Sequence, residues 1–288
     1  MRSRGCLRAL LAIVVVSALV LVGLRLLLDH LSRRPLFDAC RAEVAGMSAT
    51  LTIEEAENAA LISALSVRRG MPARAATIAL AAAFQESGPR NISYGHLDSL
   101  GLFQQRPSQG WGTAAQILDP YYATGRFYDA LAQVEGYESM EIADAAQAVQ
   151  RSAEGSAYAK HEESARALAS SLTGHSPAAF SCELREPPQV AKPAGLRTEL
   201  NKAFGRSASS RTTAKDGRSV LEVRLNDDSA TYGWSVAQWA VAYAQRFGIE
   251  SVSYRDRTWS VHESTEGWQP ADSPVPAGSV YIELAPAP

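Results

Sequence analysis

The sequence predicts a multi-domain protein in which an N-terminal transmembrane helix is followed by an all-α domain and a small α+β domain. Three observations favour this fold class: an apolar run near the N-terminus, a change from helical to alternating periodicity after a proline-rich segment, and a length of 288 residues, enough for two modest domains. We expect a cytoplasmic tip and anchor over residues 1–35, the helical domain over 36–185, a linker over 186–195 and the α+β domain over 196–288.

The apolar run lies over residues 9–28 and is long enough to cross a bilayer, which requires about twenty residues. Arg25 within it can reach the far interface through its aliphatic stem. Basic residues before the run predict a cytoplasmic N-terminus and an extracytoplasmic chain after Asp29. The sequence therefore predicts a single-pass plasma-membrane protein that contacts the lipid bilayer through one helix. A cleaved signal peptide is the alternative, although no convincing small-x-small cleavage site lies near Leu28.

The charge balance argues against a nucleic-acid partner. The chain has 28 lysines and arginines against 30 aspartates and glutamates, which gives a formal net charge of -2. Nucleic-acid binding depends on a basic excess that neutralises phosphates. We therefore exclude nucleic acid from the expected partners.

Cys40 and Cys182 bracket the predicted helical domain, whereas Cys6 precedes the apolar run. An oxidising exterior would allow Cys40 and Cys182 to form a disulfide. The alternative is two unrelated buried thiols. We expect the disulfide because both cysteines flank the domain rather than lie inside it.

The region over 36–185 is predicted to be helical apart from one loop. Thr52 and Glu55 form a capping box that opens a helix to about Arg69. The next helix, over 72–87, is apolar nearly all round, so it should be the central, buried one. The polar, glycine-containing stretch over 90–118 reads as a long irregular loop, and such loops in compact domains are usually functional.

Glu86 lies in the last turn of the expected central helix, directly before this loop. The negative end of the helix macrodipole and the alanines around it disfavour its ionisation. A carboxylic acid that stays protonated near neutrality can act as a general acid. The alternative is an ordinary surface glutamate at a helix end.

A spaced motif follows from this position. Glu86-Ser87-Gly88 is followed by Gly101-Leu102-Phe103-Gln104, with the first glycine fifteen and the glutamine eighteen residues after the glutamate. This resembles the soluble lytic transglycosylases and goose-type lysozymes, in which a Glu-Ser helix end is followed by Gly-Leu-Met-Gln at the same interval. Phe103 replaces the methionine here, and Asp98 stands where the family usually has a small residue. The resemblance covers residues of about 52–173 and implies a lysozyme-like fold.

The resemblance implies that Glu86 protonates the glycosidic oxygen between N-acetylmuramic acid and N-acetylglucosamine. It would then act as base on the muramoyl 6-hydroxyl and give a 1,6-anhydro product, so one carboxylate suffices, unlike in two-carboxylate glycosidases. Gln104 would help to position the sugar and Ser99 would shape the loop. Asp98 is a candidate second carboxylate for hydrolysis by water, and its alternative is a turn residue of the loop.

Two aromatic residues could complete a sugar cleft. Trp111 and Tyr122 are candidates for stacking on sugar rings, and their alternative is a place in the core. The sequence thus predicts a membrane-anchored enzyme that cleaves peptidoglycan glycan strands as a lytic transglycosylase or muramidase, without a cofactor. The alternative is a non-catalytic cell-wall binding or scaffold protein whose cleft grips glycan without cutting it.

The C-terminal pattern over 216–223, 233–239 and 280–284 resembles the zinc D-Ala-D-Ala carboxypeptidase-like domains of cell-wall peptidases. Those enzymes need a histidine and an aspartate around a Gly-Arg pair and a histidine on the final strand. Here Glu222 replaces the aspartate and Tyr281 stands on the final strand. The five histidines form no spacing that would supply a zinc triad, so we expect no metal and a binding or spacing module. The alternative is an unrelated α+β interaction domain.

Overall fold

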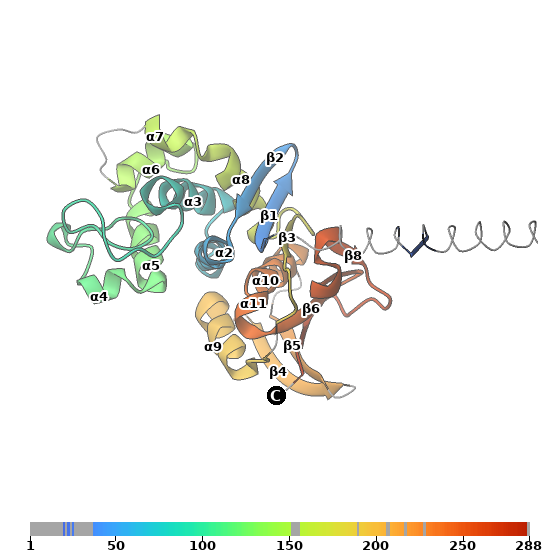
Figure 1. Ribbon diagram of the computed structural model, residues 1–288. Coiled ribbons are helices and arrows are strands. Elements are labelled where there is room, and N and C mark those ends of the chain that lie inside the picture. The colour runs from blue at the N-terminus through green and yellow to red at the C-terminus, as the bar shows by residue number, and fades with distance from the viewer. Residues whose placement is uncertain are drawn as a thin grey trace, which may run out of the picture. The chain divides into compact units, whose positions relative to one another are not determined.

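The computed structural model describes residues 37–150, 156–188, 190–205, 208–215, 218–226 and 229–286, together with Val20, Val22, Gly23 and Arg25 (Figure 1). The chain divides into two compact units, Met1–Phe37 and Asp38–Pro288.

The prediction of a transmembrane helix is corrected by the structure. Of residues 9–28, only Val20, Val22, Gly23 and Arg25 are described, so most of the predicted anchor lies outside the described residues. In the described part of the chain, no helix combines the length and the apolar character that a bilayer crossing requires. We therefore drop the single-pass topology, the bilayer contact and the plasma-membrane and extracytoplasmic localisation predicted with it.

The prediction of an all-α domain over 36–185 is wrong, because this region contains a three-stranded antiparallel sheet. Its strands are β1 (Ala39–Val44), β2 (Met47–Leu51) and β3 (Phe180–Glu183), in the order β2-β1-β3. Ala45 and Gly46, both at positive φ, form the tight turn between β1 and β2. These strands are short, and β3 comes from the far end of the region, so periodicity along the chain could not reveal its pairing with β1.

The helices of this region surround α3 (Ala73–Ser87). This helix packs against α2, α5, α6, α7 and α8, and its alanine-rich middle is buried on all sides, as predicted. The predicted capping box of Thr52 and Glu55 begins α2 and is present in both directions. The remaining helices are α2 (Ile53–Arg68), α4 (Ala114–Ile117), α5 (Pro120–Leu131), α6 (Ile142–Gln150), α7 (Ser156–Ala159) and α8 (Glu162–Leu172), with a 3-10 turn, η1, at Pro107–Gln109.

The C-terminal part combines a six-stranded antiparallel sheet with helices, as the alternating pattern predicted. The strand order is β4-β5-β9-β6-β7-β8. Its elements are α9 (Pro193–Phe204), β4 (Ala208–Lys215), β5 (Arg218–Leu225), α10 (Ala230–Ala242), α11 (Ala244–Phe247), β6 (Ile249–Tyr254), β7 (Arg257–Ser260), η3 (Val261–Glu266), β8 (Trp268–Pro270) and β9 (Ser279–Leu284). The mixture of helices and two antiparallel sheets replaces the fold class predicted for the chain.

Helix α10 joins the two parts of the unit. It packs against β6 and β9 of the large sheet and against α2 and α8 of the helical part (Figure 1). The Ser235 hydroxyl donates to the Leu172 carbonyl at 2.7 Å, and the fully buried Gln238 accepts from the Phe180 amide at 2.8 Å. The regions before and after the proline-rich segment therefore share one core, and the boundaries at 186–195 stay a prediction.

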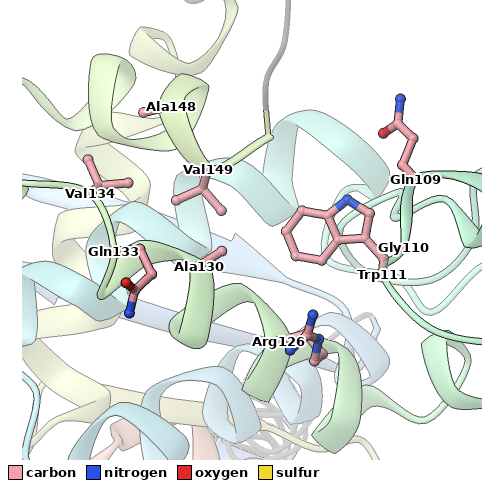
Figure 2. Close-up of a pocket in the computed structure, with 9 residues that line it drawn as sticks. All are labelled: Gln109, Gly110, Trp111, Arg126, Ala130, Gln133, Val134, Ala148 and Val149. Atoms are coloured by element: carbon pink, nitrogen blue, oxygen red, sulfur yellow. The ribbon is translucent and has the colours of Figure 1, made fainter.

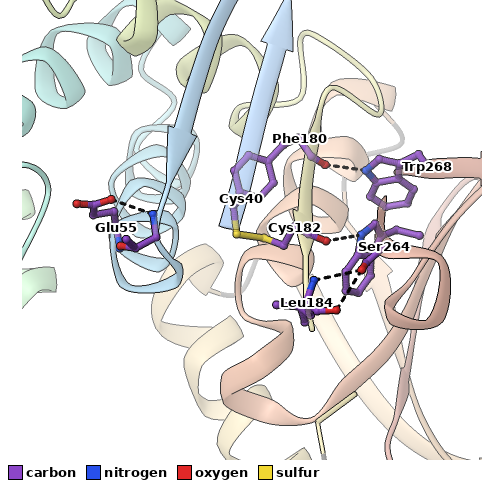
Figure 3. The surroundings of a disulfide bond; sticks show 9 residues. Cys40, Glu55, Phe180, Cys182, Leu184, Ser264 and Trp268 are labelled. Carbon is purple, nitrogen blue, oxygen red and sulfur yellow. Dashed lines mark hydrogen bonds between the residues drawn. A yellow bond between two sulfur atoms is a disulfide. The ribbon is translucent and has the colours of Figure 1, made fainter. Parts of the chain in front are cut away.

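The predicted disulfide between Cys40 and Cys182 is confirmed (Figure 3). It joins β1 to β3 at directly opposite positions of the ladder and encloses a sequence separation of 142 residues. Both cysteines are buried. The bond therefore closes the helical region at its first and last strands.

Replacing both cysteines by serine should lower the free energy of unfolding by about 2–5 kcal/mol, because the unfolded chain regains the freedom of a long loop. For a unit of this size the melting temperature should fall by roughly 5–15 °C. Calorimetry with and without reductant tests this. The reductant should shift the wild type toward the variant and leave Cys40→Ser/Cys182→Ser unchanged. Equal melting temperatures for oxidised wild type and variant would contradict the prediction.

Candidate functional site

Glu86 lies where the buried helix α3 reaches the surface. The helix ends at Gly88, whose φ of 64° provides a left-handed cap, as the sequence indicated. The alanines before Glu86 are buried, whereas Glu86 itself is partly exposed. The carboxylate is thus placed at a boundary between core and solvent by a helix that has little freedom to move.

A buried tyrosine holds this carboxylate. The Tyr158 hydroxyl, on α7, donates to Glu86 Oε1 at 2.7 Å. Tyr158 is almost fully buried, so its ring position is set by packing. A short hydrogen bond from a hydroxyl to a carboxylate is among the stronger ones in proteins. Sequence reasoning missed this residue because 72 positions separate the partners and no local spacing connects them.

Residues beside Glu86 fix the last turn of α3. The Phe84 ring stacks on His161 with centroids 5.6 Å apart, and Gln85 Oε1 lies 3.3 Å from His161 Nε2. Burial, and to a lesser extent the charge of Lys160, lowers the pKa of His161. The last turn of α3 is therefore held by ring stacking and by a side-chain contact with this imidazole.

Ser87 attaches the helix end to the glycine-containing turn of the motif. Its hydroxyl donates to the Leu102 carbonyl at 2.8 Å in a buried setting. Gln150 Nε2 donates to the Phe103 carbonyl at 2.7 Å, and the Phe103 ring stacks on Phe127. Phe103, which replaces the family's methionine, is thus a core residue. The fixed interval between Glu86 and the turn has a structural cause, since these bonds place the turn directly against the helix end.

Gly101 shows why that turn tolerates little change. Its φ is 75°, and a Cβ built on it would lie 2.8 Å from the Ile117 carbonyl oxygen. Its amide donates to the Ile92 carbonyl at 2.7 Å. A side chain here would meet backbone atoms, so the glycine is required for a close approach as well as for its backbone conformation.

Gln104 turns toward its own loop. It has a positive φ of 47°, and its Nε2 donates to the carbonyls of Tyr94 and Gly101, each at 3.3 Å. A Cβ on Gly95 would collide with the Gln104 amide, which explains that glycine. Among the described residues, no hydrogen bond joins Gln104 to Glu86. The side-chain amide of Gln104 is therefore engaged with its own loop, and the carboxylate of Glu86 with Tyr158.

Asp98 is committed to holding the loop. It accepts hydrogen bonds from Arg106 Nε at 2.7 Å, from the Ser108 amide at 2.8 Å and from the Ser108 hydroxyl at 3.0 Å. The Arg106 bond, followed by the Ser108 bonds, holds the pKa of Asp98 well below its usual range. Ser99, the next residue, is buried in the same loop. Asp98 is thus ionised, and its hydrogen bonds to Arg106 and Ser108 hold the loop together.

The two predicted aromatic residues have different settings. Trp111 lines a pocket of about 380 Å³ together with Arg126, Gln133 and Val149, and Figure 2 shows its indole on one wall of that pocket. Arg126 Nε is buried there without a hydrogen-bond partner in the described part of the chain. Tyr122 instead packs over Gly112, where an added Cβ would lie 2.7 Å from its hydroxyl. Trp111 is therefore partly buried against the core with its indole on the pocket wall, and Tyr122 supports the neighbouring backbone.

Comparison with known proteins adds one local match. A family model described as "VldE, C-terminal domain" matches residues 205–277, which is 73 of the 288 residues. No curated protein matches the chain. The match lies within the α+β part and leaves the helical site unassigned. In the described parts of the chain, no cluster of three or more His, Cys, Asp or Glu side chains could hold a metal ion.

Asp98→Asn should lower the melting temperature at neutral pH but not in acid. A carboxylate whose pKa is depressed by folding stabilises the fold above the unfolded pKa, roughly 3.9, and this contribution is lost as pH falls toward the folded value. The difference in melting temperature between wild type and variant should be constant from about pH 7 to 5 and shrink below about pH 4. The exposed Asp256→Asn is the matched control. A melting-temperature difference that persists unchanged at pH 2.5 would contradict the role of ionised Asp98 in holding the loop.

Proposed function

We propose that this protein cleaves the glycan strands of peptidoglycan with Glu86 as the general acid and base. The observation that carries the proposal is the arrangement at the end of α3. The partly exposed carboxylate of Glu86 accepts a hydrogen bond from the buried Tyr158. Ser87, the next residue, donates to the Leu102 carbonyl and so fixes the glycine-containing turn against the helix. This arrangement gives a physical basis to the motif that resembles lytic transglycosylases. The choice of substrate rests on the resemblance, and the geometry of Glu86 and Tyr158 supports general acid and base catalysis.

In this mechanism the two oxygens of Glu86 have separate tasks. Tyr158 occupies Oε1 and orients the carboxyl group, which leaves Oε2 to donate its proton to the glycosidic oxygen. After the bond breaks, the resulting carboxylate is stabilised by the Tyr158 hydroxyl. It then removes the proton of the attacking hydroxyl, so that Glu86 returns to its starting state.

The commitment of Asp98 favours a transglycosylase over a hydrolase. A second carboxylate used as base would need a free oxygen, but both oxygens of Asp98 accept hydrogen bonds from Arg106 or Ser108. With one carboxylate, the substrate's own muramoyl 6-hydroxyl is the suitable nucleophile. The expected product is therefore a 1,6-anhydro sugar.

The polar pocket beside Trp111 supports a carbohydrate substrate. Sugar rings present an apolar face to an aromatic ring and hydroxyls to amide and guanidinium groups, and the pocket offers Trp111, Gln133 and Arg126 for these roles. On the loop before it, Tyr94 and Leu97 are 68% and 69% exposed, so neither fills a groove from within. The pocket thus offers both apolar and polar contacts to a glycan chain.

One observation favours the second candidate, a protein that binds glycan without cutting it. An enzyme of the resembled family would be expected to place Gln104 across from the glutamate, but here the amide bonds to Tyr94 and Gly101. In the binding protein the surface around Glu86 would hold a glycan strand, with Glu86 as a hydrogen-bond acceptor. Activity measurement separates the two.

Glu86→Gln should abolish cleavage while leaving the fold intact. The region 36–288 is incubated with purified sacculi, and released anhydro-muropeptides are measured by mass spectrometry. Removal of a general acid should lower the rate by about 10²–10⁴-fold. The exposed Glu163→Gln on α8 carries the same charge change and should retain full activity. Equal product from Glu86→Gln would overturn the assignment, and sacculus binding without product from either protein would favour the binding candidate.

Tyr158→Phe should lower kcat with little change in KM, because the lost hydroxyl contacts the catalytic carboxyl group and not the distant parts of the substrate. A hydrogen bond to a charged group is worth about 1.5–3 kcal/mol, which corresponds to roughly 10–150-fold in rate. Tyr137→Phe, after α5, makes the same chemical change away from Glu86 and serves as the control. A variant with wild-type kcat would show that Tyr158 does not position the acid.

A further inference from the structure

A second pocket, of about 490 Å³, lies on the large sheet and takes no part in the proposed cleavage. Side chains alternate along each strand, so β9 turns Ile282 toward α10 and Tyr281 and Glu283 to the opposite face. Ser251 and Ser253 on β6 lie beside them on that face. The outer face of the sheet is therefore polar across its centre.

The segment between β8 and β9 forms one wall of this pocket. Asp272 and Val275 are among its lining residues. The segment is fixed by backbone hydrogen bonds from Ala271 to Asp256, at 2.9 Å, and from Val275 to Arg255, at 2.8 Å. The pocket volume falls within the usual range for small-molecule sites, about 300–1,000 Å³. A ligand here would be a small molecule enclosed between the sheet and this segment.

Glu222 and Glu283, two carboxylates of the pocket, differ in their hydrogen-bond partners. Glu222 is saturated, because Arg224 Nε and Arg211 Nη2 donate to its two oxygens at 3.0 and 2.8 Å. These two bonds, Arg224 first, lower the pKa of Glu222. Among the described residues, Glu283 accepts a hydrogen bond only from the Ser251 hydroxyl, at 3.2 Å, and no Lys, Arg or His side chain pairs with it. Arg211 also lines the pocket but is paired with Glu222. In the described part of the chain, Glu283 is therefore a partly buried carboxylate without an ion-pair partner.

We propose that this pocket binds a small polar molecule that carries an ammonium group, with Glu283 as the partner of that group. Transfer of an unpaired carboxylate from water into a partly enclosed site is unfavourable, and a ligand cation removes that cost. Asp272 on the opposite wall adds a second negative charge. The hydroxyls of Ser253, Thr258 and Tyr281 provide hydrogen bonds for hydroxyl or amide groups of the ligand. Glu283 lies beyond the residues of the family match.

The test uses two primary amines as probes, D-glucosamine and 1,4-diaminobutane, each beside its fully N-acetylated counterpart, which carries no charge. Amide resonances of the full chain are followed by NMR during titration. At least one amine should shift the resonances of Ser251, Ser253 and Glu283, and its uncharged counterpart should not. Glu283→Gln, which can still accept from Ser251, should weaken that binding tenfold or more. Glu163→Gln should leave it unchanged.

Three results would overturn the proposal: no shift of pocket resonances with either amine, equal binding of an amine and its acetylated form, or wild-type affinity in a folded Glu283→Gln variant. Thermal melting of the variant establishes that it is folded. Because the readout involves neither sacculi nor Glu86, failure here is independent of the proposed cleavage activity.

Discussion

The structure depends on the way in which strand β3 is held from both sides. On one side, Cys182 is bonded to Cys40 of β1. On the other, the carbonyls of Phe180 and Cys182 accept from the indoles of Trp268, at 2.8 Å, and Trp259, at 3.2 Å, and Ser264 bonds to the backbone of Leu184 (Figure 3). A buried backbone group without a partner costs about 1–3 kcal/mol, so separating the two parts would orphan several groups at once.

This constraint changes the meaning of the C-terminal part. If the C-terminal part were a separate module on a stiff linker, α2 and α8 would be exposed to solvent on that side. Instead α10 packs on both helices, and both also pack against α3. The Tyr121 hydroxyl donates to Glu199 of α9 at 2.9 Å, which makes a further contact between the parts. The framework that positions Glu86 therefore includes residues from both sides of the proline-rich segment.

Local signals predicted helix ends well, because caps act within a few residues: the Thr52 box begins α2, and α3 ends at Gly88, where the sequence placed these ends. Alternation also predicted strands in the α+β part, but it did not reveal β4, which is as long as β5. The local hairpin of β1 and β2 was missed because both strands are short, and other failures needed information from distant parts of the chain. Strands β1 and β3 pair although the whole helical region separates them in the sequence. Tyr158 bonds to Glu86 because the packing of α7 brings two residues that are distant in the sequence together.

Ser87, Gly101 and Asp98 have structural roles in and around the motif, and Glu86 differs from them. Ser87 ties the turn to the helix, Gly101 allows a close backbone approach, and Asp98 fixes the loop through Arg106. Each of these would be needed in a protein with no activity at all. Glu86 is different, because its partner is the buried hydroxyl of Tyr158, and an apolar pair of the same shape could replace both groups at little cost in stability. Its carboxylate lies at the edge of the core and accepts from Tyr158 through Oε1. No hydrogen bond among the described residues uses Oε2, which is the arrangement that the proposed acid and base role requires.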